Sequence, residues 1–445
     1  MKPMVLVTAP VGTRSGYGAH SRDICRSLIE LDKYDVRIWP VRWGSTPQNA
    51  LSEDNPQDLP IIKRLLKSPE VERQPEVHIH IVVPNEFNAL GKYNIGITAG
   101  IETTVCPAYW IEGLNRMNLN IVPAKFVKDT IEKTSFDKFD EKTKKKIGKV
   151  VSEKPVEVLF EGFDSNIYKT TKEFSLDLVN EMKEVKEDFC FLHVGHWLQG
   201  NLGEDRKDLG MLVKVFLETF KNQKNQPALI LKTSGATPCI LDREDILKKI
   251  NNIKKDVKGT LPNVYVLHGD LRDEEINQLY NHPKVKSHIT FTHGEGFGRP
   301  LLEASLSEKP IIASNWSGHL DFLSDKDSLM INGSLTEVPD SMIWSPIIIK
   351  PSKWFTVNEV DVVRKLRMFY KKHKLITKKA KRLGKKNRRE FSLKAMSSKF
   401  NKILDNVLQS IPQSVGLKLP KLKKVGSDES SQPAKIKLPK LKKMT

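Results

Sequence analysis

The sequence predicts an α/β protein with two doubly wound, Rossmann-like domains that face a central cleft, and three observations support this fold class. The chain has 445 residues, which is more than one ordinary hydrophobic core requires and therefore favours two domains. Apolar runs of strand length alternate with helical patterns in two successive series of roughly 160 residues each. In each series a glycine-rich turn directly follows an apolar run, which is where folds of this kind bind ligands.

The first series opens with VLVTAP at residues 5–10, a predicted strand that leads into a loop containing Gly12, Gly16 and Gly18. A helix is expected after this loop, because apolar residues recur there at helical spacing. The further predicted elements are strands at 35–41, 77–83, 94–100, 118–124 and 156–164 and a helix at 125–134. Together they predict an N-terminal domain over residues 1–165.

The second series opens with FCFLHVGHW at residues 189–197 and predicts a C-terminal domain over residues 166–355. Its further predicted elements are strands at 228–234, 264–270, 287–293 and 310–315 and helices near 208–222 and 300–308. Residues 356–410 follow as Lys-rich helices, and the last of these is expected to cross back to the N-terminal domain.

The net charge of +19 is concentrated in two segments. Residues 371–389 contain 11 Lys and Arg and no acidic residue, and residues 412–445 contain nine Lys against two acidic residues. The heptapeptide KLPKLKK occurs at 418–424 and again at 437–443, within a low-complexity stretch. These features predict a disordered, basic tail over residues 411–445. The basic segments would attract polyanions such as nucleic acid or anionic lipid headgroups.

Other features of the sequence bound the cellular context. No apolar run reaches the ~18 residues of a membrane-spanning helix, and the N-terminus MKPMVLVTAPVG reads as a first strand, not as a signal peptide. Cys25, Cys106, Cys190 and Cys239 are scattered without a CxxC pair, which indicates buried, reduced thiols and neither disulfides nor a zinc site. We therefore expect a cytoplasmic protein that is peripheral at a membrane or on DNA if its basic segments bind there.

The segment THGEGFGRPLLEASL, residues 292–306, places glycines between a predicted strand and a predicted helix. Glycine lets the main chain approach a ligand closely, and the N-terminus of the helix adds partial positive charge. Gly296, Phe297 and Gly298 could therefore hold part of a phosphorylated ligand. Pro300 suits the first helical turn, where its missing N–H needs no partner.

Two carboxylates of this segment, Glu295 and Glu303, are unfavourable beside an anion unless they bind another part of the ligand. A carboxylate accepts hydrogen bonds well from two neighbouring hydroxyls, which both sugars and ribose offer. The pattern therefore indicates a nucleotide sugar, with hydroxyls at both ends and negative charge between them. From spacing alone, it stays equally open that Glu295 caps the helix and that Glu303 is a solvated helix residue.

The motif GEGFGRPLLEA, followed by KPIIAS, closely resembles the signature of the family 4 retaining glycosyltransferases of the GT-B fold, in which seven residues separate two glutamates. Further segments resemble the family in the same order along the chain, namely FLHVGHW, DRKDLGMLVKVF, ALILKTSG and VLHGDLRDEEINQLY. The resemblance implies an N-terminal acceptor domain and a C-terminal domain that binds the nucleotide-sugar donor.

The resemblance also implies roles for individual residues. Glu295 would bind hydroxyls of the donor sugar and Glu303 the ribose. Arg206 and Lys207 would bind the diphosphate and neutralise its charge on departure without a metal. The further donor-binding candidates are Gly296, Phe297, Gly298, Lys232, Leu271 and Gly12, and the candidates for the acceptor side of the cleft are Glu102, His20 and Gly16. It stays equally open that Glu102 caps a helix or turn, and a lone histidine such as His20 is more often a packed or capping residue. No cofactor, metal or carboxylate nucleophile is implied.

Two residues depart from the pattern of the family. Arg299 stands where the family usually has an apolar residue, and Arg206 substitutes for an arginine that normally precedes the lysine by several positions. Asp325-Lys326-Asp327 matches the Asp-x-Asp of metal-dependent transferases of another fold, but a solvated polar loop is expected there. Aromatic side chains that could stack on a sugar or base, unless they are core residues, are Trp43, Trp110 and Trp197.

The acceptor is open between two classes. A lipid-linked or polysaccharide glycan is expected, because the family most often acts on such acceptors. Hydroxymethylated DNA, as in viral DNA modification, is the alternative, because near-neutral domains with a cationic extension suit a polyanion. A second alternative is a non-catalytic protein of the same fold that binds a nucleotide sugar or a polyanion.

Overall fold

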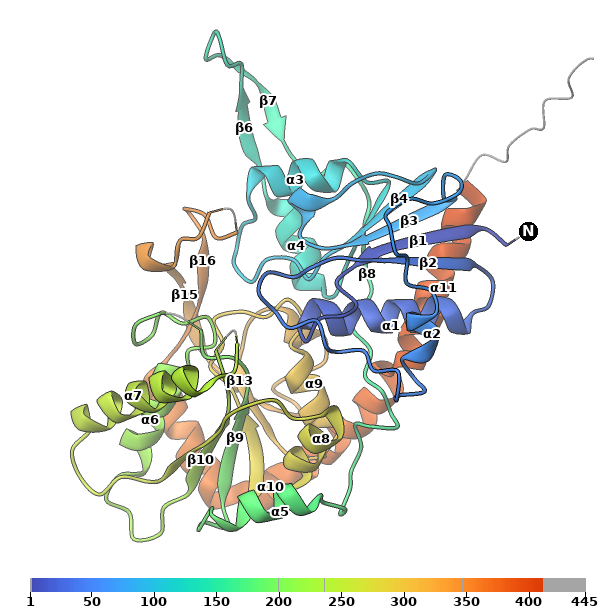
Figure 1. The fold of residues 1–445 in the computed structure, drawn as a ribbon. Coiled ribbons are helices and arrows are strands. Elements are labelled where there is room, and N and C mark those ends of the chain that lie inside the picture. The colour runs from blue at the N-terminus through green and yellow to red at the C-terminus, as the bar shows by residue number, and fades with distance from the viewer. Residues whose placement is uncertain (1, 199, 236, 346, 411–445) are drawn as a thin grey trace, which may run out of the picture. The chain divides into compact units, whose positions relative to one another are not determined.

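Two six-stranded parallel sheets form the framework of the computed structural model, which describes residues 2–198, 200–235, 237–345 and 347–410 (Figure 1). The strands of the first sheet run in the order β2-β1-β3-β4-β5-β8, and those of the second in the order β11-β10-β9-β12-β13-β14. Neighbouring strands within each sheet pair in parallel. We call the first sheet with its helices the N-lobe and the second sheet with its helices the C-lobe.

The elements follow one another in two alternating series. In the N-lobe they are β1 (Met4–Ala9), α1 (Gly16–Glu30), β2 (Asp35–Pro40), α2 (Leu59–Ile62), β3 (Val77–Ile81), β4 (Tyr93–Ile97), α3 (Ala108–Asn115), β5 (Leu119–Val122), α4 (Lys125–Lys133) and β8 (Val156–Val158). In the C-lobe they are α5 (Leu176–Lys183), β9 (Cys190–Val194), α6 (Leu209–Phe220), β10 (Ala228–Lys232), α7 (Ile240–Asp256), β11 (Val264–Leu267), α8 (Asp273–Asn281), β12 (Val285–Ile289), α9 (Arg299–Ser305), β13 (Ile311–Ser314) and β14 (Leu329–Ile331). Two long helices, α10 (Glu359–Glu390) and α11 (Leu393–Ser410), follow.

The first βα unit begins its helix earlier than the sequence predicts. β1 is buried along its whole length, as expected of a central parallel strand. Ser15 then caps α1, because its hydroxyl accepts a hydrogen bond from the backbone N of Gly18 at 3.0 Å. Gly16 and Gly18 therefore belong to the first turn of α1, not to a glycine loop. A Cβ atom on Gly18 would lie 2.2 Å from the carbonyl oxygen of Thr13, so only glycine fits at this position.

The two C-terminal helices contact different lobes. α10 packs on the C-lobe through Leu366 and Phe369, which share a buried cluster with side chains of α6. α11 lies beside α1 of the N-lobe (Figure 1), where the hydroxyl oxygens of Ser27 and Ser397 are 2.6 Å apart. Its buried side chains, among them Phe400, join the core of the N-lobe. The chain therefore ends its described part on the lobe where it began.

Two antiparallel hairpins lie outside the predicted pattern. β6 (Phe136–Phe139) pairs with β7 (Lys146–Val150), and Figure 1 shows this hairpin projecting from the N-lobe. β15 (Gly333–Glu337) pairs with β16 (Lys353–Val357) beside the C-lobe. The side chains of β6 and β7 are mostly exposed, so this hairpin lacks the alternation of apolar and polar residues by which a strand is found in a sequence.

The segment Asp325-Lys326-Asp327, expected to be a solvated polar loop, is partly buried. Asp327 is buried and accepts a hydrogen bond from Arg382 Nε at 2.5 Å, so it is not a solvated loop residue. The thiol of Cys239 is exposed at the start of α7, whereas the other three cysteines are buried. Among the described residues, no helix combines the length and apolar character that a membrane crossing requires. The predicted disordered tail, residues 411–445 with both KLPKLKK copies, lies outside the described residues.

Candidate active site

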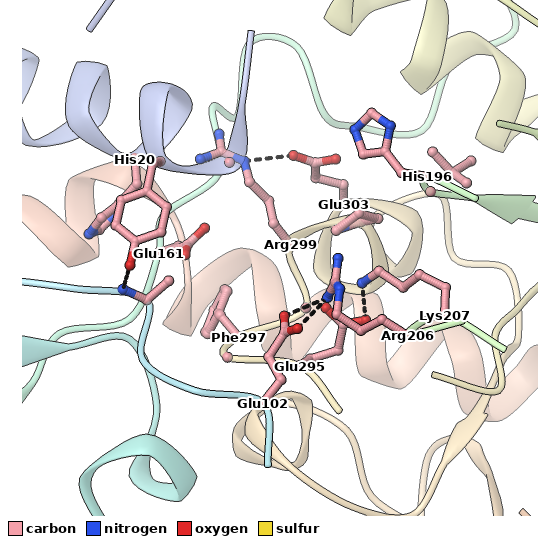
Figure 2. A pocket seen from close by; sticks show the side chains of 18 of the residues that line it. His20, Glu102, Glu161, His196, Arg206, Lys207, Glu295, Phe297, Arg299 and Glu303 are labelled. Carbon is pink, nitrogen blue, oxygen red and sulfur yellow. Dashed lines mark hydrogen bonds and ion pairs between the residues drawn. The ribbon is translucent and has the colours of Figure 1, made fainter. Parts of the chain in front are cut away.

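A cavity of about 470 Å³ lies between the two lobes, at the carboxyl ends of β4, β9 and β10 (Figure 2). Doubly wound sheets bind ligands at this edge, because the loops that leave the strands gather there. The N-lobe contributes α1 and the loops after β2 and β4. The C-lobe contributes the loop before α6, the glycine run and the start of α9. Both lobes therefore line the cavity.

The loop before α6 carries two cations and is held from both sides. The Asp205 carboxylate caps α6 by accepting hydrogen bonds from the backbone N of Leu209 at 3.1 Å and of Gly210 at 3.4 Å. The backbone N of His293, just after β12, donates to the carbonyl oxygen of Arg206 at 3.0 Å. These contacts fix the backbone of Arg206 and Lys207 between α6 and the second sheet.

Lys207 and Glu295 form a buried ion pair on the C-lobe side of the cavity (Figure 2). The backbone N of Glu295 donates to Ser317 Oγ at 2.9 Å, which fixes the glutamate in the glycine run. Burial alone would raise the pKa of Glu295, but Lys207 and Arg206 outweigh it and lower the pKa to about 2. Glu295 is therefore a carboxylate, an acceptor of hydrogen bonds, at any physiological pH.

Arg206 reaches across the cavity to the N-lobe. Its Nη1 donates to both carboxylate oxygens of Glu102, which follows β4, at 2.6 and 2.5 Å. Burial would lower the pKa of the guanidinium, but Glu102 and Glu295 raise it above its usual value, so Arg206 stays charged. Two cations and two carboxylates thus alternate from Lys207 and Glu295 on the C-lobe side to Arg206 and Glu102 at the N-lobe.

A second group of charges surrounds Arg299, the residue that departs from the family pattern. Its Nε donates to Glu303 at 2.9 Å and its Nη1 donates to Asp23 of α1 at 2.7 Å. Burial raises the pKa of Glu303 to about 7, although Arg299 opposes the shift. Burial likewise raises the pKa of Glu161, on the N-lobe side, to about 7. Burial, with a smaller contribution from the charge of Arg299, lowers the pKa of His20 to about 3, so His20 is neutral.

The glycine run brings the lobes into close backbone contact. A Cβ atom on Gly294 would lie 2.2 Å from the carbonyl oxygen of Glu102, and one on Gly296 would lie 2.4 Å from that of Ala99. Gly298 has φ +91°, a conformation that L side chains rarely adopt, directly before α9. Gly294 and Gly296 therefore allow the close approach of the two lobes, and Gly298 allows the backbone conformation before α9.

The cavity brings together eleven of the thirteen catalytic, donor-binding and acceptor candidates: Gly16, His20, Glu102, Arg206, Lys207, Lys232, Glu295, Gly296, Phe297, Gly298 and Glu303. Gly12 and Leu271 are not among its lining residues. A Cβ atom on Gly12 would meet only Gln48, at 3.9 Å, and Leu271 packs against the core of the C-lobe.

Of the three tryptophans considered for stacking, Trp43 lines the cavity, while Trp110 and Trp197 are buried core residues. Tyr17, which was not predicted for the site, stacks on Trp43 with ring centroids 4.0 Å apart on the N-lobe wall. His196 lines the cavity close after β9. No spacing rule reveals these residues, since the loops that carry them meet only in the fold. Among the described residues, no group of three or more His, Cys, Asp and Glu side chains is placed to hold a metal ion.

No protein-family model matches this chain, and no curated protein matches it. Solved structures are similar to it. For Anabaena HepE in complex with UDP-glucose the TM-score is 0.58 at 12% identity, covering 91% of this chain and 100% of that one. For sucrose-phosphate synthase of Thermosynechococcus elongatus the TM-score is 0.59 at 10% identity, covering 92% of this chain and 100% of that one. For a glycosyltransferase of Rickettsia africae the TM-score is 0.60 at 12% identity, covering 92% of this chain and 99% of that one.

The chain has the GT-B fold. This confirms the predicted fold class of two Rossmann-like, doubly wound domains. At 10–12% identity the likeness concerns the fold, and one fold supports many functions. The chemistry therefore depends on the residues of the cavity.

Proposed function

We propose that this chain is a glycosyltransferase that moves a sugar from a nucleotide-diphosphate sugar to a hydroxyl group of an acceptor. One observation carries the proposal: the partly buried cations Lys207 and Arg206 each face a carboxylate in a cavity at the ligand-binding edge of a GT-B fold. A nucleotide sugar offers a diphosphate to the cations and hydroxyls to the carboxylates. The complex of HepE with UDP-glucose, a protein of similar fold, supports this class of donor.

The proposed donor position follows the charges. Lys207 and Arg206 hold the diphosphate, which must compete with Glu295 and Glu102 for them. Glu295, ionised at neutral pH, accepts hydrogen bonds from the donor sugar. Glu303 accepts from the ribose, and Gly296, Phe297 and Gly298 let the main chain approach the phosphates. Lys232, at the end of β10, adds a further cation to the lining.

The proposed reaction is a substitution at the anomeric carbon of the donor sugar. The bond from this carbon to the diphosphate oxygen breaks, and a bond from the acceptor oxygen forms. Lys207 and Arg206 stabilise the charge that develops on the diphosphate, so the step is proposed to need no metal. The acceptor attacks from the face that the diphosphate leaves and passes its proton to the diphosphate. The anomeric configuration is thereby retained, and no carboxylate acts as nucleophile.

We propose a glycan, lipid-linked or part of a polysaccharide, as the acceptor. The stacked rings of Tyr17 and Trp43 on the N-lobe wall support this choice, because an aromatic face packs well against the apolar face of a sugar ring. Glu102 and His20 line the same cavity and offer polar groups for hydroxyls.

The test is nucleoside diphosphate release by the full chain from a panel of UDP-, GDP- and ADP-sugars, with glycans or hydroxymethylated DNA and with EDTA. We expect release from one donor, also in EDTA, and a glycoside whose anomeric configuration by NMR is that of the donor. Lys207→Ala and Glu295→Ala should each lower the rate by about tenfold or more, because transition-state electrostatics are lost. The matched control is Lys146→Ala, which removes an exposed pair with Asp137 and should change nothing.

Other outcomes would change the proposal in specific ways. Full activity of both variants would reject the site, and loss of activity in EDTA would reject metal independence. Stimulation by hydroxymethylated DNA and not by glycans would make DNA the acceptor. Release from no donor under any condition would favour a non-catalytic binding protein.

A further inference from the structure

A second cavity, of about 320 Å³, lies on the N-lobe, on the face of the first sheet that α1 does not cover. Its floor is one row of side chains across three strands: Thr8 of β1 is paired in register with Trp39 of β2 and with His80 of β3. Side chains in register on parallel strands point to the same face. The alternate residues, such as Val7 and Ile38, pack with α1 on the other face.

The floor offers hydrogen-bonding groups without charge. His78 Nε2 and Thr8 Oγ1 are 2.9 Å apart, and the backbone N of Asn88 donates to His80 Nδ1 at 3.1 Å. Because His80 Nδ1 is the acceptor, the neutral ring carries its hydrogen on Nε2, as a donor. Burial lowers the pKa of His78 to about 4 and that of His80 to about 3, so both rings are neutral near pH 7.

The walls and rim add an apolar surface and two opposite charges. Trp39 is half-buried on the edge strand β2, and Val82 and Leu90 also line the cavity. Arg42 and Glu86, both exposed, place one positive and one negative charge on the rim. A ligand for this cavity is therefore uncharged, with one apolar face for the indole and hydroxyls for the histidines and the rim. A sugar ring has this combination of surfaces.

The position of the cavity relates it to the candidate active site. Arg42 lines the second cavity, and the next residue, Trp43, lines the cavity between the lobes, where it stacks on Tyr17. The loop after β2 therefore borders both cavities. Both are parts of the N-lobe surface, the side to which the acceptor is assigned.

We propose that the second cavity is a subsite for a neutral sugar ring of an acceptor glycan, whose reactive end lies in the cavity between the lobes. This inference rests on the proposed function, because the bound glycan is an acceptor only if the protein is a glycosyltransferase. The subsite holds a sugar remote from the transferred one, so it selects acceptors that are oligosaccharides over single sugars.

The test separates sugar binding from turnover. Saturation-transfer NMR measures the binding of glucose, galactose and N-acetylglucosamine to the full chain without a donor, for the wild type, Trp39→Leu and Trp344→Leu. Trp344 is the matched control, because it lies in the segment between β15 and β16, outside the second cavity, and is 62% exposed. We expect at least one sugar to bind the wild type and Trp344→Leu, and Trp39→Leu to weaken its binding by about tenfold or more, since the stacking surface is lost.

A second variant guards against a fold defect in Trp39→Leu. Glu86 is exposed on the rim, so Glu86→Ala leaves the core unchanged and should weaken sugar binding by about threefold, the loss of one hydrogen bond. Equal binding by the wild type and both cavity variants, or no binding of any sugar, would overturn the subsite.

Nucleoside diphosphate release from the donor panel is measured in parallel. If nucleoside diphosphate is released but no sugar binds, the subsite alone is rejected. If a sugar binds the wild type and not Trp39→Leu, but no donor releases nucleoside diphosphate, the proposed function alone is rejected.

Discussion

Arg299 of α9 and Asp23 of α1 form an ion pair between the lobes, with Arg299 Nη1 donating to the carboxylate over 2.7 Å. Their side chains are 18% and 4% exposed. The same guanidinium donates to Glu303, the carboxylate assigned to the ribose. One residue therefore joins the donor side of the cavity to the N-lobe, at the position where the family resemblance leads one to expect an apolar side chain.

Replacing Arg299 by leucine should destabilise the protein strongly. The change leaves Asp23 with the more distant cations Arg26, 3.6 Å away, and Arg22, and it removes the cation that pairs with Glu303. Removing one partner of a buried ion pair costs about 3 kcal/mol or more of the free energy of unfolding, because a buried charge remains. Urea-induced unfolding of the full chain, followed by circular dichroism, measures the effect.

The matched control for this prediction is Lys33→Leu. Lys33 also pairs with a distant element, Asp405 of α11 at 3.2 Å, but both side chains are more than 40% exposed. We expect a loss below about 1 kcal/mol there, as for exposed pairs in general. The double variant Arg299→Leu/Asp23→Asn should be less destabilised than the sum of the single variants. Additive effects would show that the two residues do not interact.

Gly296→Ala should impair turnover by displacing Glu295. The new Cβ atom would lie 2.4 Å from the carbonyl oxygen of Ala99, so the glycine run and the N-lobe loop must separate. A displacement of about 1 Å in a catalytic constellation can lower the rate by about a hundredfold. Gly12→Ala is the control, because its Cβ atom would have only ordinary contacts, at 3.9 Å. Equal losses of nucleoside diphosphate release in both variants would restore Gly12 as a donor-binding residue.

How far the sequence predicts this molecule depends on how local each feature is. The two βα series and the glycine run with Glu295 and Glu303 depend on runs and motifs that the sequence displays directly. The ion pair of Glu295 with Lys207 does not, because the two residues are 88 positions apart. The start of α1 was missed because a serine cap and a steric constraint from Thr13 decide it, not hydrophobic spacing. The role of Arg299 was missed because Asp23 lies 276 residues away and meets it only when the lobes close around the cavity.

The protonation of Glu161 should make stability depend on pH. Its pKa is about 7 in the folded protein, because burial disfavours the charge, against a usual value of 4.5. Between about pH 4.5 and 7 the folded state therefore binds more protons than the unfolded state, so stability falls as the pH rises through this range and then levels off. Glu161→Gln removes this term. Its free energy of unfolding, relative to the wild type, should rise by about 3 kcal/mol from pH 4 to pH 8.

The control for Glu161 is Glu157→Gln, which makes the same chemical change at an exposed position of β8. Urea unfolding of both variants and the wild type at several pH values supplies the comparison. A difference between Glu161→Gln and the wild type that stays constant with pH would contradict the raised pKa.

Of the two glutamates of the glycine motif, Glu303 should make donor binding depend on pH near neutrality and Glu295 should not. Glu303 has a pKa of about 7 in the free protein, whereas that of Glu295 is about 2. If ribose hydroxyls bind the carboxylate of Glu303, donor affinity must fall as the pH drops below 7, by up to about tenfold per pH unit, because the proton has to leave first. Glu303→Gln should abolish this dependence, while Glu295→Gln should weaken binding equally at every pH.

Calorimetric titration with the nucleotide sugar that shows turnover, between pH 5.5 and 8.5, measures these affinities. The nucleotide sugar is preferable to the free nucleoside diphosphate, whose terminal phosphate itself titrates near pH 6 and would mimic the effect. Glu161→Gln serves as the control for the second carboxyl with a pKa of about 7, and should keep the pH dependence of the wild type. A pH dependence that survives in Glu303→Gln but disappears in Glu161→Gln would move the ribose contact from Glu303 to the N-lobe.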